Sequence, residues 1–333
     1  MPGKDKDYNK GDRKNNRENP KFFKNNMEYF SKKSQQQNAR NTFRGDVWDQ
    51  EMLKHLLQSN HEILFQDKSE YQDIVMLRAI DVRMYLNEQL QFSTLDERFY
   101  HEALVHPAMT MAKDRSRILI LGGGDGFALR EVLKYDDVKE VDLVELDPIM
   151  LNLARKEPLR NYNEGALLDP RVSLHVMDAQ NYFTSTIPSY NVIIVDFPDP
   201  ADAVISKLYT KEFFRKMAMY LMNDGILVCQ AHSPEDAPRV FWSIGLTMQS
   251  AGFYSLGYKV YVPSFGDWGF HIASKQGKVK LSTVSVPHYT LPKDLSKLFT
   301  LPEELREEKG NSAVNSLDNL ILHEIYNEEM PEK

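Results

Sequence analysis

The chain has 333 residues but only one cysteine, Cys229, and this scarcity excludes several classes of protein. A single cysteine cannot form an intrachain disulfide, and it rules out a four-cysteine zinc site within one chain. Because Cys229 ends the apolar run Ile226–Cys229, we interpret it as a buried structural thiol rather than a nucleophile. We predict no metal site. A chain without disulfides suits a reducing compartment, so we predict a cytoplasmic location.

Long hydrophobic runs are also missing. A membrane-spanning helix needs about 18 or more consecutive apolar residues, and no stretch approaches that length although 42% of the residues are hydrophobic. The first residues are polar throughout, so they lack the charged and then apolar pattern of a signal peptide. We therefore expect a soluble protein with no membrane partner.

Positive charge is scarce over most of the chain and concentrated at its start. Residues 1–45 hold 12 Lys and Arg against 5 Asp and Glu, whereas the whole chain has 41 against 48. The remainder is therefore acidic, which suits a cationic ligand. The basic start is rich in asparagine and glutamine and poor in apolar residues. We expect it to be disordered, and we expect no nucleic-acid partner.

The pattern of apolar residues divides the chain into four regions. We predict a disordered basic arm, a small antiparallel β domain, a Rossmann-like catalytic domain and a peripheral acidic tail. In the third region short apolar runs alternate with helical patterns, which is typical of a parallel sheet with crossover helices. The predicted fold class is α/β, with a methyltransferase-type parallel sheet after a small N-terminal β domain. The four regions comprise residues 1–43, 44–107, 108–286 and 287–333.

Local signals set the limits of individual elements. Asn87-Glu88, between two β-type runs, predicts a hairpin turn. Asp96 opens a helical pattern that we expect to stop at Pro107, because proline lacks the N–H that a helix interior needs. In the larger domain we expect parallel strands at 117–121, 140–145, 172–176, 192–196, 225–230 and 257–262, and a final antiparallel strand at 270–274.

A glycine-rich loop gives the strongest local signal for a ligand. The apolar run Ile118–Leu121 leads into GGGDG at residues 122–126, after which a helical pattern begins. Glycines let the backbone approach a ligand closely and point N–H groups at it. NAD and S-adenosyl binders both use variants of this pattern. A carboxylate at Asp125 would repel a pyrophosphate, so we assign Gly122, Gly124 and Asp125 to a nucleoside site of the methyltransferase type.

Acidic residues follow the next two predicted strands. Glu145 ends the strand after the loop, a position from which a carboxylate binds ribose hydroxyls. Asp178 follows the third strand, where it is placed to hydrogen-bond an adenine amino group. An ordinary acid at a strand end is the alternative for each residue. Together with the loop they indicate a nucleoside co-substrate.

Five motifs occur in order along the chain, over about residues 60–275. They are YQDI at 71–74, DERFYHE at 96–102, the glycine loop with the following LREVL, VELD at 144–147 and YNVIIVDFPDP at 190–200. In their order and spacing these motifs resemble the polyamine aminopropyltransferases, the family of spermidine and spermine synthases.

The resemblance implies an enzyme that moves the aminopropyl group of decarboxylated S-adenosylmethionine to an amine and releases methylthioadenosine. It implies a homodimer with an amine as its small-molecule partner and with no permanently bound cofactor. It assigns Asp196 as the catalytic residue, and Tyr100, His101 and Asp199 to the amine acceptor. The residues that it assigns to the nucleoside or its aminopropyl arm are Gln72, Asp125, Glu145, Asp178 and Gln230.

Several residues depart from the family's pattern. Phe197-Pro198 replaces two small hydroxyl residues, 201–203 differs from the usual Gly-Pro-Ala sequence, Phe127 replaces a loop glycine, and Phe265 replaces an acceptor-side tyrosine. These variants resemble a divergent branch with a DFPDP loop, which elsewhere is often joined to membrane segments. The donor site keeps its pattern. The acceptor stays open among putrescine, cadaverine, agmatine, spermidine and other amines.

The chemistry explains why two carboxylates follow one strand. Aminopropyl transfer is an in-line attack by an amine nitrogen on the methylene beside a sulfonium, and it needs a neutral amine in the right position. Asp196 is placed to accept the proton and Asp199 to hold an ammonium group. Two alternatives stay open: an S-adenosylmethionine-dependent methyltransferase on the same fold, and a non-catalytic polyamine-binding protein. The combination of Asp125, Asp196 and Asp199 favours catalysis.

Overall fold

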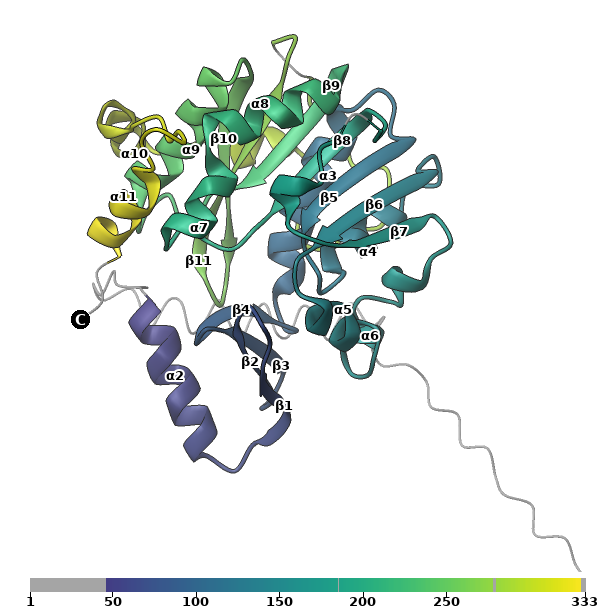
Figure 1. Cartoon of the computed structure of the whole chain (residues 1–333), viewed down its shortest axis with the longest axis vertical. Coiled ribbons are helices and arrows are strands. Elements are labelled where there is room, and N and C mark those ends of the chain that lie inside the picture. Colours follow the sequence, from purple (N-terminus) through teal and green to yellow (C-terminus); the bar gives the residue numbers. More distant parts are fainter. Residues whose placement is uncertain (1–45, 185, 278–279, 331–333) are drawn as a thin grey trace, which may run out of the picture. The chain divides into compact units, whose positions relative to one another are not determined.

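Two β sheets organise the part of the chain that the structure describes, residues 46–184, 186–277 and 280–330 of a computed structural model (Figure 1). The smaller sheet has four strands and the larger has seven. The predicted basic arm lies outside the described residues. No described helix is long and apolar enough to cross a membrane.

The small sheet follows one helix and is antiparallel throughout. Its strands pair in sequence order. Asn87 and Glu88 have φ angles of 47° and 67°, so they form the tight two-residue hairpin connection that the sequence predicts. The elements are α2 (Asp46–Gln58), β1 (Glu62–Lys68), β2 (Asp73–Arg78), β3 (Val82–Leu86) and β4 (Gln89–Ser93).

Helix α3 (Glu97–Met111) continues through Pro107, so the predicted helix stop at this residue is wrong. A proline inside a helix leaves the carbonyl four residues earlier without its usual N–H partner. Here that carbonyl belongs to Ala103, and the hydroxyl of Tyr258 donates to it at 2.8 Å. Both residues are fully buried. A side chain from a distant strand therefore supplies the hydrogen bond that the proline removes.

We expect Tyr258→Phe to lower the free energy of unfolding by about 1–3 kcal/mol, because it leaves the buried Ala103 carbonyl unsatisfied. Chemical denaturation measures the change. Tyr254→Phe, at a side chain that is 63% exposed on the same strand, is the control and should have almost no effect. Equal stability of the Tyr258 variant and the wild type would show that the carbonyl finds another donor.

The large sheet places its strands in the order β10-β11-β9-β8-β5-β6-β7. Its central neighbours β5 and β8 are parallel, and the chain leaves them toward opposite edges of the sheet. Ligands bind at such a reversal, outside the carboxyl ends of the strands. The strands are β5 (Arg117–Gly122), β6 (Glu140–Glu145), β7 (Val172–Val176), β8 (Tyr190–Asp196), β9 (Leu221–Gln230), β10 (Tyr254–Val262) and β11 (Gly266–Ser274).

Strand β11 is antiparallel to both of its neighbours, as the sequence predicts. Strand β5 shows how the sheet divides the core into two layers. Ile118 and Ile120 face one apolar cluster, with residues of α3, whereas Leu119 and Leu121 face the other. The helices of the large sheet are α4 (Phe127–Leu133), α5 (Pro148–Ala154), α6 (Leu159–Tyr162), α7 (Ala203–Ser206), α8 (Lys211–Tyr220) and α9 (Pro238–Ser250).

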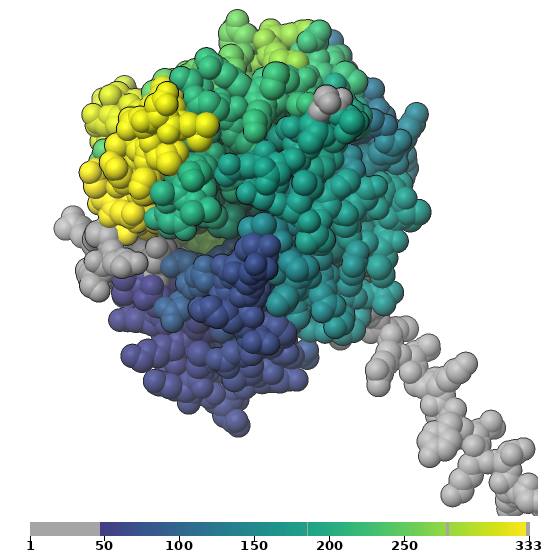
Figure 2. Space-filling view, in the orientation of Figure 1, coloured from purple at the N-terminus to yellow at the C-terminus, as the bar shows by residue number. Residues whose placement is uncertain are grey.

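The segment after residue 287 differs from the peripheral tail that the sequence suggests. Its last helix, α11 (Leu322–Glu329), buries Ile325 and Tyr326 to 2% exposure each. Helix α11 lies beside α9, and in the space-filling view the yellow C-terminal segment lies directly against green side chains (Figure 2). The carboxylate of Glu329 accepts the first N–H groups of α9 at 3.0 and 3.1 Å. One face of this amphipathic stretch thus completes the core.

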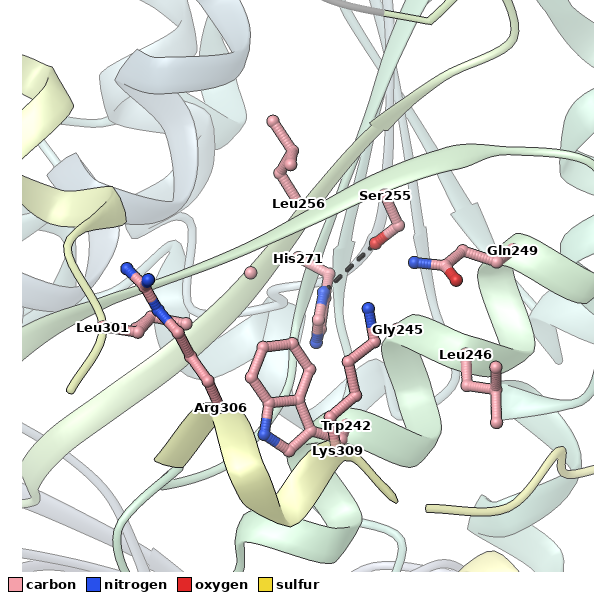
Figure 3. A pocket seen from close by; sticks show the side chains of 11 residues that line it. Trp242, Gly245, Leu246, Gln249, Ser255, Leu256, His271, Leu301, Arg306 and Lys309 are labelled. Carbon is pink, nitrogen blue, oxygen red and sulfur yellow. Dashed lines mark hydrogen bonds between the residues drawn. The ribbon is translucent and has the colours of Figure 1, made fainter. Parts of the chain in front are cut away.

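A cavity of about 310 Å³ lies between α9, β10, β11 and the C-terminal segment, and Trp242, Gln249 and Lys309 line it (Figure 3). His271 also lines it, but both of its ring nitrogens have partners, the Phe241 carbonyl at 2.8 Å and the Ser255 hydroxyl at 3.1 Å. Burial lowers the pKa of His271 to about 4, so this ring is neutral. None of the predicted site residues lines this cavity.

Candidate active site

The glycine loop lies against the ends of two neighbouring strands. Gly122 has a φ angle of 83°, and a Cβ there would lie 2.1 Å from the backbone oxygen of Asp196 at the end of β8. A Cβ on Gly124 would lie 2.6 Å from Glu145 Oε2 at the end of β6. Only glycine allows these approaches. The loop therefore brings the predicted Asp196 and Glu145 to one place.

Glu145 holds the loop from the side of β6. Its carboxylate accepts the N–H of Gly124 at 3.1 Å and the N–H of Asp147 at 2.9 Å. Burial raises the pKa of Glu145 to about 7. Each carboxylate oxygen accepts one N–H here and keeps capacity for a further donor, such as a hydroxyl group.

Gln72 and Asp178 lie at the same edge as Glu145. The Gln72 side chain, just before β2, donates to Asp147 Oδ2 at 2.9 Å, and Asp147 also caps α5. Gln72 thus connects the small sheet to the end of β6. Asp178 follows β7 and accepts the N–H of Gln180 at 2.8 Å. Contacts of Gln72 and Asp178 with a nucleoside stay predictions.

Asp196 is half-buried beside Tyr100 of α3. The Tyr100 hydroxyl donates to Asp196 Oδ1 at 2.6 Å. Burial raises the pKa of Asp196 to about 6, with a contribution from the charge of Asp125, and His101 and the Tyr100 hydrogen bond oppose the rise. Burial and the Asp196 charge also raise the pKa of Tyr100, so this hydroxyl keeps its proton. Asp196 is therefore a carboxylate able to take up a proton near neutral pH.

His101 lies next to Tyr100 and between the acidic groups. Its Nδ1 is 2.9 Å from Glu97 Oε2 and 2.8 Å from the Glu97 carbonyl. Burial lowers the pKa of His101, but the bond to Glu97 and the charges of Asp125 and Asp196 raise it more. His101 thus places a proton-bearing ring among three carboxylates. Its contact with the acceptor stays a prediction.

A buried ionic network supports this ring from behind. The guanidinium of Arg130 on α4 binds both oxygens of Glu97 at 2.8 and 2.9 Å, and its Nε donates to Glu131 at 2.8 Å. Burial alone raises the pKa of Glu97, but Arg130 and His101 lower it to about 2. Glu97 belongs to the DERFYHE motif, but the motif alone does not indicate its role. Its position four residues before His101 on one helix face was the available signal.

Asp199 has two side-chain partners that its motif does not predict. Its Oδ2 is 2.9 Å from Nδ1 of His232, and its Oδ1 accepts the Gln230 side-chain N–H at 3.3 Å. His232 is absent from the predicted site. It lies two residues after Gln230, at the carboxyl end of β9, and that position was the signal for it.

Gln230 is buried behind the loop that carries Asp199. Its side-chain nitrogen lies 2.8 Å from the Phe197 carbonyl and 2.7 Å from the Tyr209 hydroxyl. Its oxygen accepts the N–H of His232 at 3.0 Å. These contacts orient the loop. The predicted contact between Gln230 and the nucleoside stays a prediction.

Aromatic rings line the side of the site next to Tyr100. Ring centroids of Phe265 and Trp268 lie 6.5 and 6.2 Å from that of Tyr100. The hairpin between β10 and β11 carries both rings, and Asp96 fixes it by accepting the N–H of Ser264 at 2.6 Å. Phe265 has no hydroxyl, so its ring gives this wall an apolar surface. Such a wall suits the methylene chain of an amine.

The arrangement can therefore bind a nucleoside at the loop and a cation at two carboxylates. Six of the predicted residues meet at the ends of β5 and β8: Gly122, Gly124, Asp125, Tyr100, His101 and Asp196. Glu145 and Asp178 lie toward β7, whereas Asp199 and Gln230 lie toward β9. Among the described residues, no group of His, Cys, Asp and Glu is arranged to hold a metal ion.

Comparison with known proteins identifies a family whose members have related sequences. Residues 97–285 match the spermine/spermidine synthase domain family. The chain is 50% identical over 292 residues to polyamine aminopropyltransferase 2 of Bacillus cereus, covering 86% of this chain and 80% of the relative. It is 46% identical to polyamine aminopropyltransferase 1 of Streptomyces coelicolor over 63% of this chain and 41% of the relative.

Solved structures share the fold. A spermidine synthase in complex with the transition-state analogue AdoDATO has a TM-score of 0.70 and 25% identity, over 75% of this chain and 89% of that one. The spermidine synthase of Thermotoga maritima has a TM-score of 0.68 and 26% identity, over 75% and 88%. With this domain match and a half-identical relative of similar extent, the chain belongs to the spermine/spermidine synthase family.

Proposed function

We propose that this chain transfers the aminopropyl group of decarboxylated S-adenosylmethionine to a diamine or polyamine and releases methylthioadenosine. The observation that carries the proposal is the Asp196 carboxylate, which Tyr100 holds at 2.6 Å beside the glycine loop. Family membership supports the same reaction. We also propose a homodimer, for which the resemblance to the family is the support, and a cytoplasmic location, which suits a chain without disulfides.

In this mechanism Asp196 receives the proton of the attacking amine. A carboxylate whose pKa is raised to about 6 by burial is a better proton acceptor than an ordinary aspartate. Asp199 binds an ammonium of the acceptor, and the apolar wall of Phe265 and Trp268 packs against the methylene groups. The thioether leaves as a neutral group, so no acid is needed for its departure. Catalysis depends on holding the two reactants in line.

The donor site contains the means to select the decarboxylated donor. Intact S-adenosylmethionine ends in an ammonium and a carboxylate, whereas the decarboxylated form ends in an ammonium alone. The charge of Asp125 raises the pKa of Asp196, so the two carboxylates lie close enough to interact. A donor carboxylate would face these like charges. Two unit charges about 4 Å apart interact by roughly 4 kcal/mol at an effective dielectric near 20.

We expect the decarboxylated donor to bind on the order of 10²- to 10³-fold more tightly than the intact donor, because of this repulsion. Isothermal calorimetry with both donors measures the ratio, and Asp125→Asn should reduce it. Turnover assays then identify the product. Tighter binding of the intact donor with release of S-adenosylhomocysteine would favour a methyltransferase, and amine binding without turnover would favour a non-catalytic binding protein.

A further inference from the structure

His232 has an unusual backbone at the end of β9. Its φ angle is 58°, in the left-handed region that few non-glycine residues adopt. The surrounding structure holds this conformation on both sides. The N–H of His232 donates to Gln230 at 3.0 Å, and its carbonyl accepts the N–H of Gly269 at 2.8 Å. Such conformations persist where the neighbouring contacts determine them, and they are frequent at functional sites.

The imidazole ring of His232 is also fixed by its surroundings. The residue is 5% exposed. Its ring centroid lies 5.0 Å from that of Trp268 on β11 and 5.3 Å from that of Tyr326 on α11. The C-terminal helix therefore takes part in holding this ring. A ring enclosed in this way keeps its Nδ1 directed at Asp199.

We infer that His232 is a positioning residue, which fixes the Asp199 carboxylate in the orientation that binds an ammonium of the acceptor amine. The inference rests on the proposed function and concerns the acceptor side of the same site. His232 and Gln230 contact one oxygen of Asp199 each, at 2.9 and 3.3 Å. Each oxygen has a second lone pair for the amine. A carboxylate that is already oriented loses less entropy on binding.

Two substitutions separate the hydrogen bond of His232 from its packing. His232→Phe keeps an aromatic ring between Trp268 and Tyr326 but has no N–H for Asp199. His232→Asn removes the ring, restores a donor, and suits the left-handed backbone. A hydrogen bond to a charged group accounts for about 10- to 100-fold in affinity. We therefore expect His232→Phe to raise the acceptor KM by this factor, with the donor KM and kcat changed less than about threefold.

The asparagine variant should recover a large part of the acceptor KM. His175→Phe is the matched control, because His175 also contacts a carboxylate, Asp142 at 2.7 Å, and an aromatic ring, Tyr182. It should leave both KM values unchanged. An unchanged acceptor KM in His232→Phe, or a donor KM that rises equally, would overturn the inference. So would an asparagine variant no better than the phenylalanine variant.

A second measurement separates this inference from the proposed function. If the wild type releases no methylthioadenosine, the proposed transfer fails, whatever His232 does. Calorimetric titration with putrescine and spermidine in the presence of methylthioadenosine still measures amine binding. A 10-fold or larger loss of amine affinity in His232→Phe alone would support the positioning role. Equal affinity of wild type and variant, or no amine binding by the wild type, would refute it.

Discussion

Asp196→Asn should lower kcat by at least about 100-fold, the usual loss when a general base is removed. The amide keeps the shape of the side chain and can still accept the Tyr100 hydrogen bond, which measures 2.6 Å in the native site. It cannot take up the proton of the amine. Single-turnover kinetics with saturating donor and acceptor measure the effect. Donor affinity should fall much less than kcat, because Asp125 still faces the donor.

Asp202→Asn is the control for this substitution. Asp202 lies in the same loop and accepts the N–H groups of Val204 and Ile205, and asparagine caps a helix about as well as aspartate. This variant should retain wild-type turnover. If Asp196→Asn also kept kcat within a few-fold of the wild type, Asp196 would be structural and the proposed mechanism would be wrong.

Arg130→Met should lower the free energy of unfolding by about 3–5 kcal/mol. Its guanidinium is the shared partner of Glu97 and Glu131, whose side chains are 4% and 0% exposed. Removing Arg130 from this buried ionic network leaves an excess of negative charge in the interior, which costs far more than the loss of a surface pair. Equilibrium denaturation in urea measures the difference from the wild type.

Arg78→Met provides the comparison at the surface. Arg78 pairs with Glu62 at 3.2 Å, and the two side chains are 49% and 62% exposed. Exposed pairs contribute about 0–1 kcal/mol. Similar losses of unfolding free energy in the two variants would mean that the buried network stabilises the fold no more than an ordinary surface ion pair does. Because Glu97 also orients His101, turnover of the Arg130 variant should fall along with its stability.

The central strands of the large sheet could be predicted because each is a continuous apolar run. Strands buried on both faces have this pattern, and the apolar runs of β5 and β8 are buried in this way. The strands at 140–145 and 172–176 also have the predicted limits. The glycine loop and the acids at strand ends were predictable for a related reason. In a parallel sheet the carboxyl ends of neighbouring strands share one edge, so residues far apart in sequence meet there.

What could not be predicted depends on partners from distant elements. Helix propensity alone predicts that the helix ends at Pro107, but the Tyr258 hydroxyl replaces the missing N–H donor. His232 has no motif of its own, and its role follows from the distance to Asp199. The segment after 287 is rich in polar residues, and its apolar side chains are buried only by packing against elements distant in the sequence, α9 among them. In each case tertiary contacts decide a feature that the local sequence does not.

The replacement of a helix hydrogen bond by Tyr258 also constrains the order in which this protein folds. The donor and the acceptor are 155 residues apart in the chain. Helix α3 carries Tyr100 and His101, and its backbone is satisfied only after strand β10 has docked. During synthesis α3 emerges long before that strand. The helix that positions the predicted acceptor residues therefore completes its backbone hydrogen bonds only when the antiparallel edge of the large sheet closes.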